Sequence, residues 1–327
     1  MAPDTTGPTV VVTDYTFGNL DVEREILEPL GCTIVPAQCR TVAEVAAAVR
    51  DADFVLTQFA PVSAEAIQAM TKVQLIARYG IGVDNVDLIA AREHGIPVYN
   101  VPGFCIDEVA DHTLGFILSL TRQITRLSVD IKAGKWGTIP PLSTFRALGD
   151  ITTGVVGCGR IGRAVIERLK PFKTRILAYD PAMSAEQIAA LGCEPVSLDR
   201  LFTDSDLITL HCPSTPETRN LINANSLAQM KDGVLIVNVA RGSVVDQGAL
   251  IAALQSGKVG GAGLDVFAVE PIEKDSPLLT MDQVIVTSHV ASASVRAAST
   301  LRRSVAETVA LKLRGAPVPN CVNGVTA

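Results

Sequence analysis

The chain has 327 residues, of which 48% are hydrophobic and 19% are charged. This length predicts about two domains, and the apolar share excludes a disordered chain. The net charge is -6 and the 28 Lys and Arg residues are scattered, so the chain offers no positive field for a nucleic acid or an anionic membrane, and neither is expected as a partner.

The sequence also argues against a membrane or metal protein. No apolar run approaches the roughly 18 residues that a membrane span needs, since the run at 114–120 is soon followed by Arg122. The N-terminal segment has no basic flank before its apolar residues, unlike a signal peptide. The seven cysteines show no Cys-x-x-Cys pair and no zinc-ligand spacing. We therefore expect a cytoplasmic protein without a metal site.

Short β-branched runs alternate with helical segments from end to end, which is the pattern of parallel sheets joined by crossover helices. Thr41 and Glu44 form a capping box at the start of an early helix. The first hundred residues are expected to form a five-stranded α/β unit. Its strands are expected at 9–13, 32–35, 53–57, 73–77 and 96–99.

The segment 107–131 is expected to form one long helix, because apolar residues recur in it at three-, four- and seven-residue steps and Gly134 follows as a stop. Its high apolar content predicts that it packs between domains or subunits. A loop rich in Pro, Gly and Thr comes next. This loop separates the first alternating unit from a second one.

The second unit begins near residue 150 and repeats the alternation of strands and helices. Ser184 and Gln187 form a capping box, while Gly192 and Gly257 occupy expected helix ends. A final helix is expected over 294–314. We therefore expect two unequal α/β domains. The strands of the second unit are expected at 152–156, 175–179, 194–196, 207–211, 234–238, 260–264 and 284–286.

A glycine-rich turn, Gly-Cys-Gly-Arg-Ile-Gly, follows an apolar strand and opens a helix. Gly157 is expected to make the tight turn, Gly159 to let the backbone approach a pyrophosphate, and Gly162 to let helix and strand pack closely. The next strand ends in Asp180, where a carboxylate can bind the ribose hydroxyls. No Arg or Lys follows it to pair with a 2′-phosphate, so NAD is favoured over NADP. The alternative is a structural turn beside an unrelated acid.

Hydride transfer to or from a carbonyl needs a proton donor and acceptor that works near neutrality, and histidine suits that task. His94 lies at a polar helix end and is expected to be solvated, whereas His112 is expected to be packed. His211 ends a strand and is a candidate for the adenine side of the cofactor. His289 follows the last expected strand, at the edge where reactive groups of such sheets gather, and is our candidate for the general acid and base.

Two charged residues are candidates to assist that histidine. Arg241 follows a strand and can form a fork on a substrate carboxylate while polarising its carbonyl, although a surface salt bridge is the alternative. Glu270 is the acid that we expect beside His289, since a neighbouring carboxylate favours the protonated imidazole and so raises the pKa of such a group. Asp265, five residues earlier, is a candidate to bind the nicotinamide carboxamide.

Several motifs occur along the chain in one recognisable order: RYGIGVDNVD, NVPG, GCGRIG, LHCPSTPETRNLI, NVARGSVVD, GLDVFAVEP and TSHVAS. Through them the chain resembles, over nearly its whole length, the NAD-dependent D-isomer-specific 2-hydroxyacid dehydrogenase family. That family includes phosphoglycerate dehydrogenases and the C-terminal-binding-protein corepressors.

The resemblance implies an Arg, Glu and His catalytic trio, which falls on Arg241, Glu270 and His289. It also implies a substrate loop whose backbone amides hold a carboxylate while its arginine reaches the rest of the substrate. That loop falls on Arg78, Tyr79, Gly80, Ile81 and Gly82. Besides the three glycines of the turn, the implied cofactor contacts are Arg160, Ile161, Asp180, Cys212, Pro213, Thr218, Ala240 and Asp265.

The resemblance further implies a Rossmann doubly wound parallel sheet over 103–290. A smaller, discontinuous flavodoxin-like substrate domain is implied over 1–102 and 291–327. Homodimers are implied through the cofactor domain. The implied activity interconverts a 2-keto acid and the D-2-hydroxy acid with NAD(H), so the expected partners are a small acid and a second copy. The regulatory module of long phosphoglycerate dehydrogenases is not expected.

Two alternative functions stay open. The first is an NADH-sensing protein of the corepressor type, although vertebrate members of that branch have a tryptophan where this chain has Ser292. The second is a phosphite-type dehydrogenase, which uses the same residue types in its trio. Formate dehydrogenases instead have a glutamine at the position of Glu270, which argues against that activity.

Overall fold

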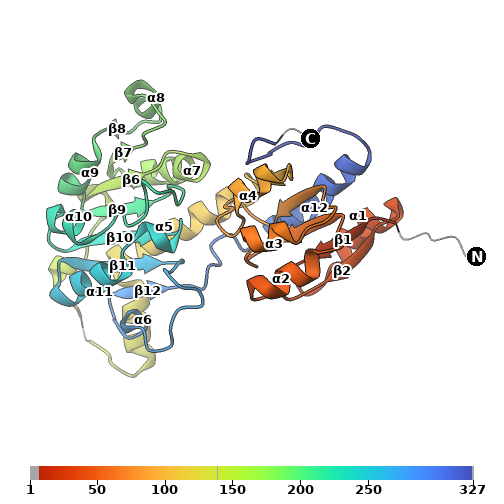
Figure 1. Ribbon diagram of the computed structural model, residues 1–327. Helices are drawn as coiled ribbons and strands as arrows, with labels where there is room; N and C mark the ends of the chain where they lie inside the picture. Colours follow the sequence, from red (N-terminus) through yellow and green to blue (C-terminus); the bar gives the residue numbers. More distant parts are fainter. Residues whose placement is uncertain (1–6, 138, 326–327) are drawn as a thin grey trace, which may run out of the picture. The chain divides into compact units, whose positions relative to one another are not determined.

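The computed structural model describes residues 7–137 and 139–325, in two compact units (Figure 1). Unit 1 combines Met1–Phe104 with Ser294–Ala327, and unit 2 comprises Cys105–Ala293. The chain therefore leaves unit 1 once and returns to it. The sequence placed these divisions at 102/103 and 290/291, whereas the structure has them at 104/105 and 293/294.

Unit 1 is a five-stranded parallel sheet in the order β2-β1-β3-β4-β5, which is the flavodoxin-like order. Its strands are β1 (Thr9–Val12), β2 (Thr33–Pro36), β3 (Phe54–Thr57), β4 (Leu75–Arg78) and β5 (Val98–Tyr99). Its helices are α1 (Asp21–Leu27), α2 (Val42–Val49), α3 (Ala64–Gln68), α4 (Leu88–Glu93) and the returning α12 (Val295–Leu313).

Side-chain alternation along the strands divides the core of unit 1 between the two faces of the sheet. Val10 and Val12 of β1 belong to a cluster with residues of α1 and α12, whereas Val11 belongs to a cluster with residues of α2, α3 and α4. All four residues of β3 and of β4 are buried, as expected for central strands of a parallel sheet.

Unit 2 is a seven-stranded sheet in the order β12-β11-β10-β9-β6-β7-β8, and its strand pairs are parallel. The chain order reverses at β6, as in a Rossmann doubly wound sheet. Its strands are β6 (Thr152–Val156), β7 (Arg175–Tyr179), β8 (Glu194–Pro195), β9 (Leu207–Leu210), β10 (Val234–Asn238), β11 (Val259–Leu264) and β12 (Val284–Val286). Its helices are α5 (Ile106–Arg122), α6 (Ile124–Lys132), α7 (Arg160–Leu169), α8 (Ala185–Ala189), α9 (Leu198–Asp204), α10 (Ala224–Gln229) and α11 (Gln247–Ser256).

The predicted fold class is confirmed, and so are the two capping boxes at Thr41 and Ser184. The single long helix expected over 107–131 is wrong. The chain breaks at Gln123, which adopts a left-handed φ of 56° between α5 and α6. The apolar periodicity continues across this break, and the sequence has no glycine or proline at it. The pattern therefore did not predict the break.

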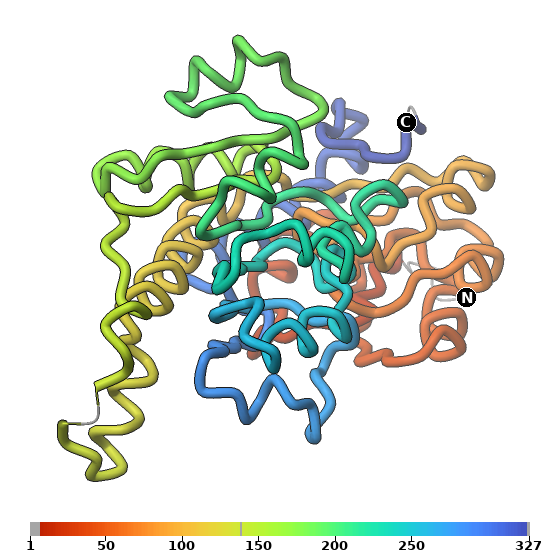
Figure 2. Tube along the Cα trace, turned by 90° about the vertical axis from the view of Figure 1, so that its left-hand side faces the viewer, coloured from red at the N-terminus to blue at the C-terminus, as the bar shows by residue number. Residues whose placement is uncertain are grey.

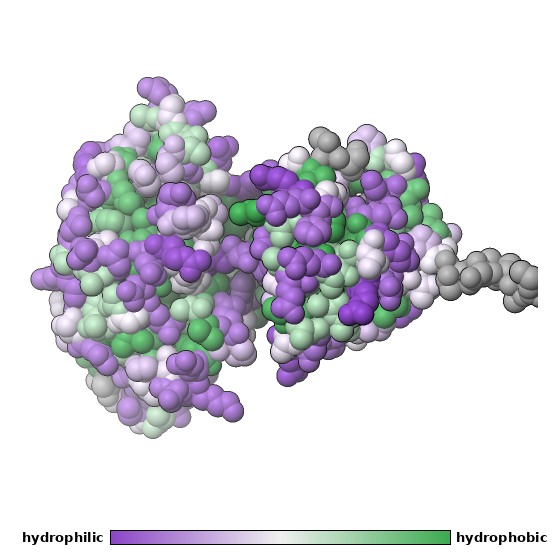
Figure 3. Space-filling model, viewed as in Figure 1, coloured by the Kyte–Doolittle hydropathy of each residue, from purple (hydrophilic) through white to green (hydrophobic). Residues whose placement is uncertain are grey.

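The two segments on either side of the break differ in burial. α5 packs on α7, β10 and β11, whereas none of the residues of α6 is buried. With the chain that follows it, α6 extends as an arm away from the sheet of unit 2 (Figure 2). On the face drawn in Figure 3, apolar residues are interspersed among polar ones. Within the described residues, no helix has the length and apolar character to cross a membrane.

Candidate active site

The sequence-predicted residues of unit 2 follow the carboxyl ends of its parallel strands, which meet at one edge of the sheet. This edge is where open α/β sheets bind their ligands, at the point where the strand order reverses. The glycine turn follows β6, Asp180 follows β7, Cys212 follows β9, Arg241 follows β10, Asp265 follows β11 and His289 follows β12.

The three glycines of the turn have different surroundings, and the tight turn at Gly157 and the close packing at Gly162 are as expected. Gly157 has φ 93°, and a Cβ there would lie 2.8 Å from backbone atoms of His211 and Cys212. A Cβ on Gly162 would lie 2.0 Å from the carbonyl oxygen of Gly157, so helix and turn are in direct contact. A Cβ on Gly159 would meet no atom of another part of the chain within 4 Å. This residue lies at the N-terminus of α7, whose positive end favours a phosphate group.

Asp180 is connected to the glycine turn through its carboxylate. One oxygen accepts a hydrogen bond from the Cys158 amide at 2.8 Å, and the other accepts one from the Ala182 amide at 2.9 Å. A carboxylate offers about four acceptor sites, so both oxygens retain capacity for the hydroxyls of a ribose. The turn and the acid therefore fit the dinucleotide that they were expected to hold.

The cysteines beside this turn are held as thiols. Burial raises the pKa of Cys158 to about 12 and the pKa of Cys212 to about 11. The loop after Cys212 is fixed by Thr218, whose hydroxyl donates to the carbonyl of Pro213 at 2.6 Å and accepts from the amide of Thr215 at 2.8 Å. A neutral buried thiol is a weak nucleophile. Cys158 and Cys212 are therefore expected to shape the site and not to react.

His289 and Glu270 meet directly, as the sequence predicted. Nδ1 of His289 lies 2.7 Å from Oε2 of Glu270, and the two side chains are 29% and 33% exposed. The other carboxylate oxygen accepts a hydrogen bond from the Phe267 amide at 3.0 Å, which fixes the orientation of the acid. With Nδ1 directed to Glu270, Nε2 is the ring nitrogen that can exchange a proton with a ligand.

Three groups around Glu270 favour its charged form. Burial raises the pKa of this carboxyl, but the hydrogen bond and charge of His289, the Phe267 amide and the charge of Arg241 outweigh burial and lower the pKa below its ordinary value. Glu270 is therefore an anion at neutral pH. A fixed anion on one side of an imidazole stabilises the protonated ring.

Arg241 lies in the loop after β10, at the start of the short 3₁₀ helix Gly242–Val244. The Asn238 side chain fixes this loop, since its amide group donates to the Arg241 carbonyl at 2.9 Å and its oxygen accepts from the Ala240 amide at 3.0 Å. A Cβ on Gly242 would lie 1.8 Å from the carbonyl oxygen of Phe267, so the loops carrying Arg241 and Glu270 are packed together. Asn238 was missed, although a polar residue ending an otherwise apolar strand was a signal.

The backbone at His289 is held in a conformation that few such residues adopt. Its φ is 55°, in the left-handed region, and its amide donates to the carbonyl of Asp265 at 2.8 Å. The buried carboxylate of Asp265 accepts from the amides of Val290 and Ala291, both at 2.9 Å, and from the hydroxyl of Thr287 at 2.6 Å. These bonds offset the strain at the position that presents the imidazole.

These contacts give Asp265 a role that the sequence did not suggest. In the sequence, Asp265 was a candidate to bind the nicotinamide carboxamide. In the structure, its carboxylate binds the loop that carries His289. Thr287 extends the contact to His112 of α5, because its hydroxyl also lies 3.1 Å from Nε2 of that ring. His112 packs edge-on against Phe116, as expected for a packed residue.

The remaining histidines have no part in the trio. His94 is exposed, and its Nδ1 lies 2.8 Å from the carbonyl of Ala90. His211 has a buried Nδ1 without a hydrogen-bond partner, while its Nε2 lies 2.9 Å from the Thr209 hydroxyl. Burial lowers the pKa of His211 to about 3, so this ring is neutral at physiological pH.

The expected substrate loop lies in unit 1, directly after β4. The Tyr79 amide donates to the carbonyl of Thr57. The Gly80 amide donates to the carbonyl of Arg78 at 2.9 Å, which closes a three-residue turn. Gly80 has φ 151°, and a Cβ there would lie 1.3 Å from the guanidinium of Arg78, so the arginine lies over the glycine. The positive φ is the ground that favours glycine, because the close approach involves only the end of the flexible Arg78 side chain.

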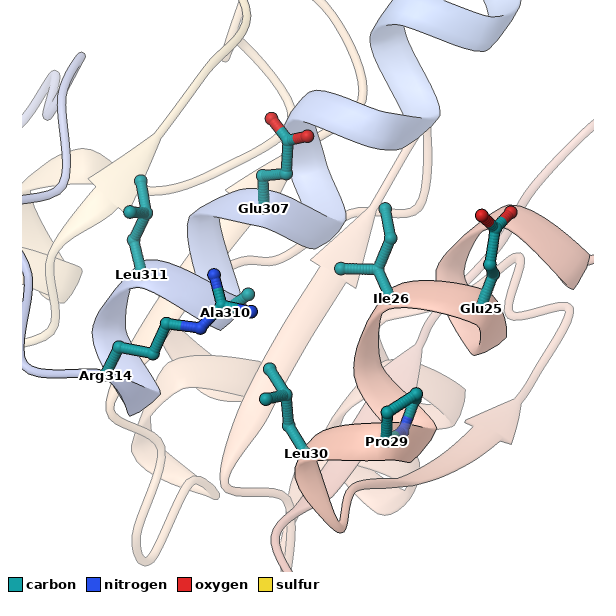
Figure 4. A pocket seen from close by; sticks show the side chains of 8 residues that line it. All are labelled: Glu25, Ile26, Pro29, Leu30, Glu307, Ala310, Leu311 and Arg314. Atoms are coloured by element: carbon teal, nitrogen blue, oxygen red, sulfur yellow. The ribbon is translucent and has the colours of Figure 1, made fainter.

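Unit 1 also contains a cavity of about 440 Å³ between α1 and α12. Apolar side chains line it together with those of Glu25, Glu307 and Arg314 (Figure 4). None of the predicted site residues lines this cavity. Among the described residues, no group of His, Cys, Asp and Glu side chains is arranged to hold a metal ion.

Comparisons with known proteins agree with this architecture. Residues 114–291 match the family model for the NAD-binding domain of D-isomer specific 2-hydroxyacid dehydrogenases. D-3-phosphoglycerate dehydrogenase of Mycobacterium leprae is 43% identical over 85% of this chain and 52% of its own length. Glyoxylate reductase of Korarchaeum cryptofilum is 38% identical over 84% of each chain.

A solved structure extends the likeness to both units. The D-lactate dehydrogenase of Aquifex aeolicus, crystallised with NAD and lactic acid, superposes with a TM-score of 0.88 at 30% identity, covering 97% of this chain and all of the other. The chain spans about half the length of the phosphoglycerate dehydrogenases that it matches. Its NAD-binding domain makes NAD the cofactor of unit 2. The chain belongs to the D-isomer specific 2-hydroxyacid dehydrogenase family, in the branch that resembles phosphoglycerate dehydrogenase.

Proposed function

We propose that this protein is an NAD-dependent oxidoreductase that interconverts a 2-keto acid and the corresponding D-2-hydroxy acid. The observation that carries the proposal is the contact of 2.7 Å between His289 and Glu270, beside the loop of Arg241. This reaction needs an acid-base group, which is His289, and an anion that favours the charged form of that group, which is Glu270. It also needs a cation that binds the substrate carboxylate, which is Arg241. NAD(H), when bound, accepts or supplies the hydride at the substrate carbon.

The residues of the chain then have separate tasks. In the direction of reduction, Nε2 of His289 donates its proton to the carbonyl oxygen as the hydride reaches the carbon, and the neutral ring is reprotonated from water. Glu270 holds Nδ1 and stabilises the protonated ring. Arg241 binds the carboxylate and polarises the carbonyl. Unit 2 holds the cofactor, while Arg78 and the amides of Ile81 and Gly82 in unit 1 have the task of binding the acid.

A panel of 2-keto acids tests this function. Each acid is added to the protein with NADH, and the loss of NADH absorbance is followed. Both stereoisomers of each product are then offered with NAD in the reverse direction. We expect turnover of at least one acid and oxidation of only its D isomer. Turnover restricted to the L isomer, or to none of the acids, would contradict the proposal.

Cofactor choice is assigned to Asp180. Its carboxylate accepts a hydrogen bond from the Cys158 amide of the glycine turn. A 2′-phosphate on the ribose would therefore be repelled by the negative charge of this carboxylate. We expect NADH to support a far higher kcat/KM than NADPH, and the Asp180→Ser variant to narrow this difference. Equal use of both cofactors by the unaltered protein would contradict the role of Asp180.

We also propose that the protein is a homodimer that associates through the arm formed by α6 and the chain after it. Several large apolar side chains are exposed there: Ile124, Val129, Ile131, Trp136 and Leu142, the last two at 89% and 80%. Such a patch is typical of a subunit interface. Light scattering should give twice the mass of the chain, and Val129→Lys with Trp136→Lys should halve it. A monomeric unaltered protein would contradict the dimer.

A further inference from the structure

A buried polar cluster lies behind the substrate loop of unit 1. The Tyr79 hydroxyl donates to Oε1 of Glu23 at 3.2 Å, and Glu23 is fully buried. Arg302 of the returning helix α12 donates to the same carboxylate from Nε at 3.0 Å and from Nη2 at 2.7 Å. The cluster therefore connects β4, α1 and α12, three elements that are distant in the sequence.

The cluster fixes its tyrosine from several sides. The Tyr79 ring packs edge-on against Phe17 with 5.3 Å between ring centroids, and the Arg302 guanidinium lies 5.1 Å from the centroid of the Phe17 ring. Nη2 of Arg302 also donates to the carbonyl of Asn19 at 2.8 Å. Burial first, and then Glu23, raises the pKa of Tyr79 well above its ordinary value, so the hydroxyl keeps its proton and remains a donor.

Tyr79 is also the central residue of the turn that forms the substrate loop. The turn is closed by the bond from the Gly80 amide to the Arg78 carbonyl. On the far side, Gly80 accepts from the Val101 amide at 2.9 Å and Ile81 accepts from the Asn100 side chain at 2.6 Å. The amides of Tyr79 and Gly80 both donate to backbone carbonyls, so the amides left for the acid are those of Ile81 and Gly82. Because a side chain and its own backbone move together, fixing the Tyr79 ring fixes the turn from which these two residues continue.

We propose that the Tyr79–Glu23–Arg302 cluster is a positioning device that sets the geometry of the substrate loop and hence the affinity for the substrate carboxylate. The inference rests on the proposed function, in which that loop binds the acid. The three side chains bond to one another inside unit 1, so they act through the loop backbone. A buried carboxylate needs both partners, and this need keeps the tyrosine in place.

The test uses the full chain and the best keto acid of the panel. Tyr79→Phe removes only the hydroxyl, and Arg302→Lys keeps the charge while losing the two-point contact. We expect each variant to raise the KM for the keto acid by about fivefold or more, with kcat and the Kd for NADH within about twofold of the unaltered protein. A KM within twofold in both variants would overturn the proposal.

Two matched controls separate this effect from a general loss of stability. Arg303→Met alters the neighbouring arginine of α12, whose contact with Glu25 is exposed and 3.8 Å long. Tyr99→Phe makes the same change in a buried tyrosine of the adjacent strand β5. Neither should change the KM. A rise in KM in the controls equal to that in Tyr79→Phe would also overturn the proposal.

Hydrogen exchange distinguishes failure of this inference from failure of the proposed function. If the unaltered protein reduces no keto acid, the function is wrong, and the cluster is then judged by amide exchange at residues 78–82. Faster exchange there in Tyr79→Phe than in Tyr99→Phe, with the rest of unit 1 unchanged, supports the positioning role. Equal exchange in the two variants rejects it.

Discussion

Each sheet carries a buried aspartate just past the end of a strand, and each aspartate holds a neighbouring loop. Asp14 of unit 1 accepts from the amides of Gln58 at 2.9 Å and Phe59 at 2.6 Å. Asp265 of unit 2 accepts from the amides of Val290 and Ala291, both at 2.9 Å. Asp14 is 7% exposed and Asp265 is 1% exposed. The same device therefore occurs in both units.

The difference lies in what the two loops carry. The loop held by Asp14 places the Phe59 ring 5.7 Å from the guanidinium carbon of Arg78, next to the proposed binding loop. The loop held by Asp265 carries His289 in its left-handed conformation. In unit 1 the buried acid supports the loop beside the proposed binding surface, and in unit 2 it supports the proposed proton donor. We therefore expect changes in unit 1 to alter KM and changes in unit 2 to alter kcat.

The largest effect is expected from His289→Ala. Loss of the proton donor should lower turnover by roughly 10²- to 10⁴-fold while NADH still binds, because the glycine turn and Asp180 are untouched. Steady-state kinetics and quenching of fluorescence on NADH binding measure the two quantities. The exposed His94→Ala serves as control and should be fully active. Unchanged turnover in the first variant would show that the proton donor is assigned wrongly.

Glu270→Gln should have the next largest effect. The amide cannot stabilise the protonated ring as an anion does, so kcat for reduction should fall by about 10²-fold, and the pH profile should lose the acid limb that titration of Glu270 contributes. Because His289 and the other contacts lower the pKa of Glu270, the unaltered enzyme should keep this anion as the pH falls below the ordinary range of a glutamate. A profile superposable on that of the unaltered enzyme would contradict this role.

Asp265→Asn and Asp14→Asn compare the two units directly. Each change removes the charge that two backbone amides contact, and we expect an effect of about tenfold in each case. The effect should appear in kcat for Asp265→Asn and in the KM for the keto acid for Asp14→Asn. Kinetics over a range of keto-acid concentrations measure both. A change in KM for Asp265→Asn and in kcat for Asp14→Asn would refute the proposal that unit 1 governs binding and unit 2 governs turnover.

The last prediction concerns stability instead of activity, and it contrasts His211 with His289, the proposed proton donor of the same sheet. Burial lowers the pKa of His211 to about 3, so between pH 6.5 and 3 the unfolded chain binds a proton that the folded chain does not. This group therefore makes the free energy of unfolding decrease as the pH falls through that window, by up to about 1.4 kcal/mol per pH unit. His211→Gln should reduce the slope seen in urea unfolding. An equal reduction in the exposed His94→Gln would contradict burial as the cause.

Local patterns were sufficient to predict most of the elements. The strands lie where β-branched runs predicted them, and Gly157, Gly192 and Gly257 all have positive φ. Asp246 caps α11 by accepting from the Ala249 amide. The break at Gln123 was missed, because the apolar periodicity continues through it and the residue type gives no sign of a left-handed turn.

The sequence by itself determined the alternation of strands and helices, the glycine turn and the residue types after each strand. These depend on side-chain period and backbone preference over a few neighbouring residues. Only the tertiary structure decided which groups meet. Asp265 contacts amides 25 and 26 positions away, and Arg302 contacts a glutamate 279 positions away. Such pairs depend on strand order and on the docking of a returning helix, which no local pattern specifies.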